Sequence, residues 1–319
     1  MTSRVVVASN RFVVAWNRFW FQPVETSTMA LFRVAFGLLA LGYTLSLAPV
    51  LFAFYSDDGI LPAQPTYSGT LAWGMLGFFP SDAAVVLFYF LLLVGTIALL
   101  AGFRARLAAL VVFICLISFG RRDPWVLNSG DLLVQVLAFY MLFMPSGTPL
   151  SVDRWLGEPR RFWEFPARAI WPLRLVQVQV SILYLAAVWA KVRGVTWNDG
   201  TAVSYAFRID DVARFPVPGF VTDSLVISNL LTYGTLAVEL SIGILVWNRV
   251  LRPWVLLLGV GLHLGIDYAV RVGFFSYAVI VAYIVFIPPE AARSFILATR
   301  DRVARLTLPR WAPLPRRPE

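Results

Sequence analysis

Apolar residues fill eight long runs of the chain, and polar or charged residues gather in the segments between them. Each run is long enough, or nearly long enough, for the roughly 20 residues with which a helix crosses a bilayer. The runs cover residues 28–50, 82–102, 105–121, 130–146, 171–191, 225–247, 253–271 and 274–290. The pattern therefore predicts an all-α, polytopic membrane protein with about eight transmembrane helices.

Two segments outside these runs, residues 1–24 and 56–80, have a different pattern. Residues 1–24 carry Arg4, Arg11 and Arg18 among Val, Phe and Trp, a spacing that suits an amphipathic segment along the inner membrane surface. A basic tail without that structure is the alternative. Residues 56–80 contain Gly and Pro that would break a full span, so we expect them to lie at the interface or to dip partway in.

Basic residues orient the predicted spans. With both termini cytoplasmic, most arginines fall in the inner loops and in residues 293–319, as the positive-inside rule requires. The last segment reads as a basic amphipathic helix followed by a Pro-rich end. We therefore expect a multi-pass protein of the cell (plasma) membrane, with span 171–191 ending on the outer side.

Composition supports this class and narrows the chemistry. The 319 residues are 59% apolar and 14% charged, against roughly 25% charged in soluble domains. The net charge of +9 comes from arginines next to the spans, so we expect contacts with membrane lipids and none with nucleic acid. One cysteine and one histidine leave no residue set for a multi-His or thiolate metal site.

The only lysine, Lys191, ends an apolar run and is followed by the turn VRGVTWNDG, which contains Trp197. A cation at the rim of a hydrocarbon span is costly unless it is paired or used. Lysine, unlike arginine, can become a neutral amine when it is desolvated. Gln177, Tyr184 and Lys191 are spaced seven apart and so share a helix face. This face predicts one wall of a cavity open to the outer side, although Gln and Tyr alone would also be explained as polar contacts between helices.

Two further charges fall within predicted spans. Glu239 lies near the middle of span 225–247, too deep to reach the surface, so it must be protonated or paired. Arg33 is a possible partner, which would make a structural pair, and a proton-handling role for Glu239 is the alternative. Arg33 could instead extend to the inner interface.

His263 and Asp267 are four residues apart and face the same way in span 253–271. Asp267 could hold the imidazole in one tautomer. A hydrogen-bonded core histidine without further function is the alternative. Because Lys191 and His263 both lie toward the outer leaflet in this topology, one catalytic pocket could contain both.

The fourth predicted span opens with PWVLNSGDLLVQ on the outer side. Asn128 or Ser129 could cap its first turn, and Asp131 suits a helix N-terminus. Asn128 and Asp131 would also face the predicted outer pocket.

Several stretches resemble the HTTM (horizontally transferred transmembrane) family, which is related to vitamin K-dependent gamma-glutamyl carboxylase. They cover most of residues 24–290, with residues 25–292 as an HTTM-like transmembrane domain. The carboxylase has a histidine where this chain has Gly130. The stretches are ETSTMALFRVAFGLLAL, PWVLNSGDLLVQVLAFYMLFMPSG, LSVDRW, AAVWAKVRGVTWNDGTAVSY and GLHLGIDYAVRVGFFSYAVIVAYIVFIPPE.

The resemblance implies roles for Lys191 and His263. In the carboxylase, the corresponding lysine deprotonates vitamin K hydroquinone, which then reacts with O2 and drives addition of CO2 to a glutamate side chain. The resemblance thus implies Lys191 as base, His263 as a polarising or hydrogen-bonding group, and menaquinol with O2 and CO2 as co-substrates. It also implies a secreted peptide or protein as acceptor. The alternative is a non-catalytic membrane partner, maturation factor or immunity factor for a secreted peptide.

Overall fold

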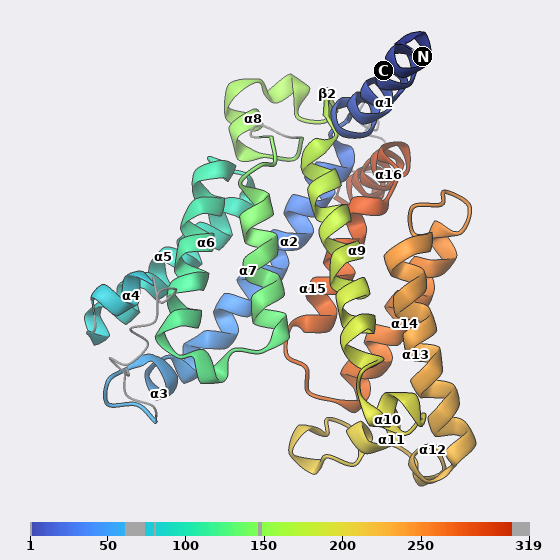
Figure 1. Ribbon diagram of the computed structural model, residues 1–319. Helices are drawn as coiled ribbons and strands as arrows, with labels where there is room; N and C mark the ends of the chain where they lie inside the picture. Colours follow the sequence, from blue (N-terminus) through green and yellow to red (C-terminus); the bar gives the residue numbers. More distant parts are fainter. Residues whose placement is uncertain (1, 61–73, 80, 146–148, 308–319) are drawn as a thin grey trace. The chain divides into compact units, whose positions relative to one another are not determined.

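A computed structural model describes residues 2–60, 74–79, 81–145 and 149–307 of the chain (Figure 1). It is mostly helical, as the apolar runs predict. The chain divides into two compact units, and α7 (Ser129–Met141) and α9 (Trp171–Lys191) each contribute residues to both. Unit 1 comprises residues 1–124, 137–176 and 287–319, and unit 2 comprises residues 125–136 and 177–286.

Unit 1 is built mainly of helices from the two ends of the chain. A short antiparallel pair of strands, which the all-α prediction missed, joins Pro23 to Ala169 in register. The elements are α1 (Thr2–Phe21), β1 (Pro23–Glu25), α2 (Ser27–Leu47), η1 (Ala48–Val50), α3 (Leu51–Tyr55), α4 (Met75–Phe78), α5 (Asp82–Ala101), α6 (Ala105–Arg122), α8 (Val152–Gly157), η3 (Pro159–Arg161), β2 (Ala167–Ala169) and α16 (Pro289–Thr307).

Two hydrogen bonds tie the start of α2 to the start of α16 inside unit 1. The Ser27 hydroxyl donates to the carbonyl of Pro289 at 2.6 Å, and the Thr28 hydroxyl donates to the carbonyl of Ile287 at 3.0 Å. These two bonds fix the N-terminal end of α16 against the start of α2.

Unit 2 holds the remaining helices. Figure 1 shows α13 and α14 side by side, with short helices in the segment between α9 and α13. The elements are α10 (Val195–Asn198), α11 (Ala202–Phe207), η4 (Asp210–Val212), α12 (Gly219–Asp223), α13 (Leu225–Leu245), α14 (Arg252–Ala269), α15 (Phe275–Tyr283) and η5 (Ile284–Phe286); η2 (Pro124–Val126) lies at the boundary of the units.

Four helices of the described residues are long and apolar enough to cross a membrane: Ser27–Tyr55, Asp82–Ala101, Trp171–Lys191 and Leu225–Leu245. A fifth span results if Phe275–Phe286 and Pro289–Leu306, which meet at a bend of 110°, are counted as one broken span. The count of eight is therefore not confirmed.

The other predicted spans form helices that are shorter or more polar. Helix α7 has 13 residues, which extend only about 20 Å of the roughly 30 Å hydrocarbon core. Helix α6 carries arginines at both ends, and α14 contains Arg252, His263 and Asp267. Of the predicted interfacial stretch 56–80, residues 61–73 and 80 lie outside the described residues, and α4 is the helix described in the remainder.

Candidate functional site

Helix α9 places three polar residues along one face. Apolar residues carry the helix to Lys191, where a turn closes with the Gly194 amide donating to the Lys191 carbonyl at 2.9 Å. Residues seven apart rise by about 10 Å per step, so Gln177, Tyr184 and Lys191 follow one another along the helix at that interval. Each of the three contacts a different partner in unit 2.

Lys191 is paired with Glu239 of α13. The ammonium nitrogen lies 2.8 Å from each carboxylate oxygen. The Glu239 side chain is 7% exposed and that of Lys191 is 23% exposed, so the lysine side chain is partly exposed while its partner is buried. Trp197 of α10 lies beside the pair, with its ring centroid 5.3 Å from the nitrogen. The structure thus joins Lys191, Glu239 and Trp197 in one cluster.

Tyr184 lies at the centre of a second cluster. Its hydroxyl is hydrogen-bonded to Nε2 of His263 at 2.6 Å and also contacts the hydroxyl of Tyr283 on α15. All three side chains are buried, and the edge of the His263 ring meets Phe275 at 5.5 Å between centroids. Nδ1 of His263 is buried and has no hydrogen-bond partner within the described part of the chain.

Gln177 has a structural contact. Its amide nitrogen donates to the carbonyl of Val285 at 2.6 Å. This carbonyl lies in η5, where the helical ladder of α15 has ended. The bond therefore ties the N-terminal part of α9 to η5, as expected for a polar contact between apolar helices.

The expectation that Asp267 orients His263 is wrong. One carboxylate oxygen of Asp267 accepts from Arg214 at 2.5 Å and from the Tyr277 hydroxyl at 2.8 Å. Arg214 reaches it because residues 212–214 run beside the end of α14, with an Ala213–Val270 bridge. A cationic donor and a phenol thus occupy the carboxylate, and His263 bonds to Tyr184 instead.

Asn128 and Asp131 form a cap on α7. The Asn128 side-chain oxygen accepts from the amide of Gly130 at 2.7 Å and from that of Asp131 at 3.2 Å. Asp131 in turn accepts from the Asn128 amide at 2.8 Å. This reciprocal pattern satisfies amides that a helix start leaves free. The capping interpretation accounts for both residues.

Gly130 lies in the first turn of α7, against the start of α15. A Cβ atom at this position would be 2.5 Å from the backbone nitrogen of Phe275. Since Phe275 also packs on His263, the missing side chain lets α7 approach the neighbourhood of the Tyr184 cluster closely. A histidine, which the carboxylase has here, would need a shift of this backbone.

Arg33 belongs to unit 1 and serves a different purpose. Its guanidinium donates to the carbonyls of Leu99, Leu100 and Leu150 at 2.9, 2.6 and 2.6 Å. Arg33 thus bonds to these carbonyls, and Glu239 pairs with Lys191 in place of the predicted Arg33.

Sequence reasoning missed Tyr283, Arg214 and Tyr277. Tyr283 stands in the apolar run VIVAYIVF, where a buried phenol usually needs a hydrogen-bond partner, and this was the available signal. Arg214 and Tyr277 could not be matched to Asp267 by spacing, because one lies in a loop and the other on the next helix. Within the described residues, no group of three or more His, Cys, Asp and Glu side chains could hold a metal ion.

These features define a helical membrane protein whose apolar helices enclose a lysine–glutamate pair and a tyrosine–histidine–tyrosine cluster. Comparison with protein families shows that residues 21–290 match the HTTM domain. The match covers most of the chain, so the protein belongs to the HTTM-domain family. No solved structure matches it.

Proposed function

We propose that this protein is a membrane enzyme that uses Lys191 as a base on a quinol or another lipidic substrate in a pocket near the outer leaflet. The observation that carries the proposal is the pairing of a partly exposed lysine with a buried glutamate at the end of an apolar helix. A base in this position would meet substrates that arrive from the lipid phase.

The pair gives the lysine a way to act as base. An ammonium has no lone pair, so Lys191 must lose a proton before it can take one from a substrate. Glu239, 2.8 Å away through both oxygens, can receive that proton.

A quinol fits the side chains present. It has a weakly acidic phenol on a flat apolar ring, which suits an amine flanked by the Trp197 ring. His263 retains one nitrogen without a partner in the described part of the chain, so it can accept or donate one more hydrogen bond. When bound, vitamin K hydroquinone (menaquinol) would be oxidised by O2, and this oxidation would drive the addition of CO2 to a glutamate in a secreted peptide or protein.

The proposal includes the eight-span topology, with both termini cytoplasmic, in a multi-pass plasma-membrane protein. The arginine distribution supports it, because this orientation leaves more basic residues inside than outside. Reporter fusions after residues 124 and 224 should then report the outer side, and a fusion after residue 292 the inner side. The opposite pattern would overturn the orientation.

The enzymatic test uses purified full-length protein in lipid vesicles with vitamin K hydroquinone and O2. Chromatography should detect vitamin K epoxide from the wild type and from Arg193→Gln, whose arginine stacks on Trp189 rather than on the pair. Lys191→Ala should lose the product while still inserting into the membrane. Equal turnover in all three proteins would contradict a role for Lys191 as base.

A non-catalytic partner, maturation factor or immunity factor for a secreted peptide is the second candidate. It is favoured by the bonds of Gln177 and Tyr184, which satisfy these residues within the fold. Mass spectrometry of the purified protein distinguishes the two functions. Bound quinone supports the enzyme, whereas a stoichiometric peptide or subunit without quinone supports the partner.

A further inference from the structure

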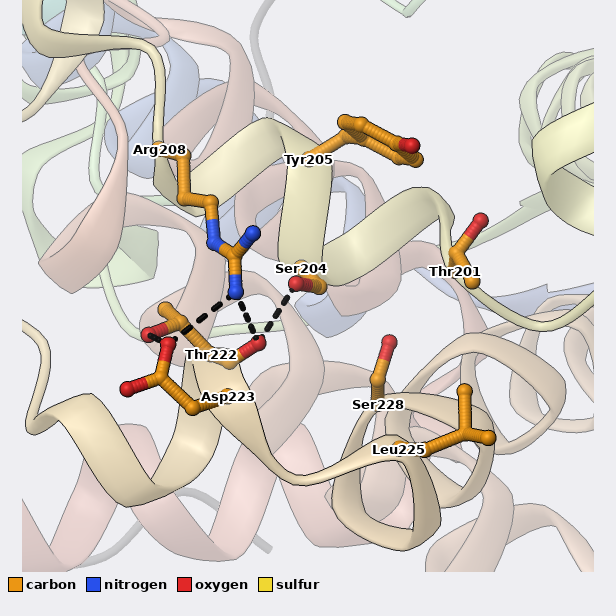
Figure 2. Close-up of a pocket in the computed structure, with 8 residues that line it drawn as sticks. All are labelled: Thr201, Ser204, Tyr205, Arg208, Thr222, Asp223, Leu225 and Ser228. Carbon is orange, nitrogen blue, oxygen red and sulfur yellow. Dashed lines mark hydrogen bonds and ion pairs between the residues drawn. The ribbon is translucent and has the colours of Figure 1, made fainter.

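A small polar pocket lies in unit 2, away from the Lys191 pair, between α11, α12 and the first turn of α13. Its volume is about 160 Å³. Figure 2 shows the guanidinium of Arg208 pointing toward Thr222 and Asp223, with hydroxyl groups on the neighbouring helices. The lining includes Thr201, Ser204, Arg208, Asp223, Leu225 and Ser228.

Both signs of charge are available to a ligand here. Arg208 donates to the Thr222 carbonyl at 2.8 Å and to an Asp223 oxygen at 3.0 Å. Because the two side chains are 53% and 73% exposed, their ion pair is a weak surface pair. A ligand with an anionic and a cationic group can therefore bind to each partner without a large loss.

The hydroxyl groups suit the cationic part of such a ligand. Ser204 donates its hydrogen to the Thr222 carbonyl at 2.6 Å, and Ser228 donates to the Gly200 carbonyl at 3.1 Å. Each hydroxyl oxygen then has lone pairs left to accept a bond. These oxygens and the Asp223 carboxylate are acceptors for an ammonium, while Arg208 is a donor for phosphate oxygens.

The position of the pocket indicates where the ligand comes from. Helix α13 is a candidate membrane span, and Leu225 and Ser228 lie in its first turn. The pocket therefore lies at the end of a candidate span, where lipid headgroups would be. Apolar side chains on α12 and at the start of α13 are highly exposed, with Phe220 at 67%, Leu225 at 63% and Val226 at 76%, which suits contact with acyl chains.

The volume limits the ligand to a small group. A cavity of about 150 Å³ holds a molecule the size of benzene, whereas drug-sized ligands need about 300 Å³ or more. From size, charge and depth together, we infer that this pocket binds the headgroup of a zwitterionic phospholipid of the phosphoethanolamine type. Arg208 holds the phosphate, and Asp223 with the hydroxyls holds the ammonium. This inference does not depend on the function proposed for Lys191.

The test is native mass spectrometry of the purified full-length protein given equal amounts of phosphatidylethanolamine and phosphatidylglycerol. The variants are Arg208→Gln, Asp223→Asn and the control Arg271→Gln, an exposed arginine of the same unit outside the pocket. Circular dichroism checks that each variant folds. If Arg208→Gln does not fold, Asp223→Asn carries the test.

Wild type and Arg271→Gln should retain phosphatidylethanolamine about tenfold better than phosphatidylglycerol, since one charge-assisted contact is worth about that factor. Arg208→Gln should lose this retention about tenfold. Asp223→Asn should lose the preference and still bind phosphatidylglycerol. A wild type without preference, or an Arg208→Gln that behaves like Arg271→Gln, would overturn the inference.

Soluble phosphoethanolamine shows whether the pocket recognises the headgroup alone or only the headgroup of an intact lipid. Displacement of the lipid by millimolar phosphoethanolamine shows that the headgroup alone is recognised. Retention of the lipid under the same conditions, with the Arg208 dependence intact, shows that acyl chains are also required. Displacement that is equal in wild type and Arg208→Gln contradicts the assignment.

Discussion

Arg33 in unit 1 and Lys191 in unit 2 are both cations on apolar helices, yet their partners differ in kind. Arg33 is 2% exposed and bonds to three backbone carbonyls, two of them in the last turn of α5. Lys191 is partly exposed and bonds to one carboxylate. Carbonyls at a helix end attract a cation but cannot take its proton. A carboxylate can, so only Lys191 has a partner suited to proton transfer.

The difference matches the residue types. Guanidinium stays charged at accessible pH and offers several donors in a fixed plane, which suits three carbonyls around one point. Lysine has a single nitrogen that can become neutral. Arg33 therefore links α2, α5 and the segment at Leu150 as a structural clamp. Lys191 is the residue of the two that could transfer a proton.

Replacing Arg33 should produce the largest loss of stability. Arg33→Met removes the donors from the Leu99, Leu100 and Leu150 carbonyls and should lower the free energy of unfolding by about 3–5 kcal/mol. Thermal unfolding in detergent measures the effect. Arg106→Gln, an exposed change in the same unit, should stay within about 0.5 kcal/mol. Similar stabilities of the two variants would show that Arg33 is not a clamp.

Exchanging the two cation types should separate fold from chemistry. Lys191→Arg keeps a charge beside Glu239 and should fold, but it removes the base and should lower quinol turnover by about 10²–10⁴-fold. Arg33→Lys should instead lower stability, because one ammonium cannot reach three carbonyls in the same geometry. Epoxide formation and thermal unfolding are measured for both variants. Full turnover of Lys191→Arg would make Lys191 a structural residue like Arg33.

The tyrosine cluster should show a graded effect. Tyr184→Phe leaves Nε2 of His263 without its partner and should cost about 1–3 kcal/mol of folding stability. Tyr283→Phe removes only the contact at the other end of the cluster and should cost about 0.5–1.5 kcal/mol. The two variants are compared by thermal unfolding. The reverse order would mean that the His263 bond contributes less than the contact between the phenols.

The smallest effect should come from a glycine near Lys191, and a glycine beside Arg33 provides the contrast. Gly102 has a φ of 72°, and a Cβ there would lie 2.5 Å from Cβ of Ser151 and 2.8 Å from an Arg33 nitrogen. Gly102→Ala should therefore cost at least about 1–2 kcal/mol. Gly194 follows Lys191 with a negative φ, and its nearest contact would be 3.2 Å away, so Gly194→Ala should stay within about 0.5 kcal/mol. Equal losses would show that both surroundings are similarly rigid.

Helix positions were predictable where the apolar run coincides with a cap. Helices α5 and α13 begin at the predicted residues, Asp82 and Leu225, because Ser81 and Ser224 accept bonds from their first turns. The span predicted for 274–290 is interrupted for a local reason. Helix α15 ends at Tyr283, and Pro288-Pro289 forces the chain to bend before α16.

The site was predictable only within single helices. Spacing placed Gln177, Tyr184 and Lys191 on one face, and the structure agrees. Partners on other helices were not predictable in the same way: the sequence offered Arg33 for Glu239, and the structure pairs Glu239 with Lys191. The His263–Asp267 prediction fails because Arg214 and Tyr277 compete for the carboxylate, and neither lies on α14.

Lys191 also gives the protein a single lysine side chain for chemical labelling. Since Lys191 is the only lysine, amine-selective acylating probes have one side chain to modify, and the modified peptide can be counted by mass spectrometry. Acylation requires a free amine. The Lys191 nitrogen is instead held 2.8 Å from both oxygens of the Glu239 carboxylate. The labelling rate therefore reports how often this pair opens, without knowledge of any substrate.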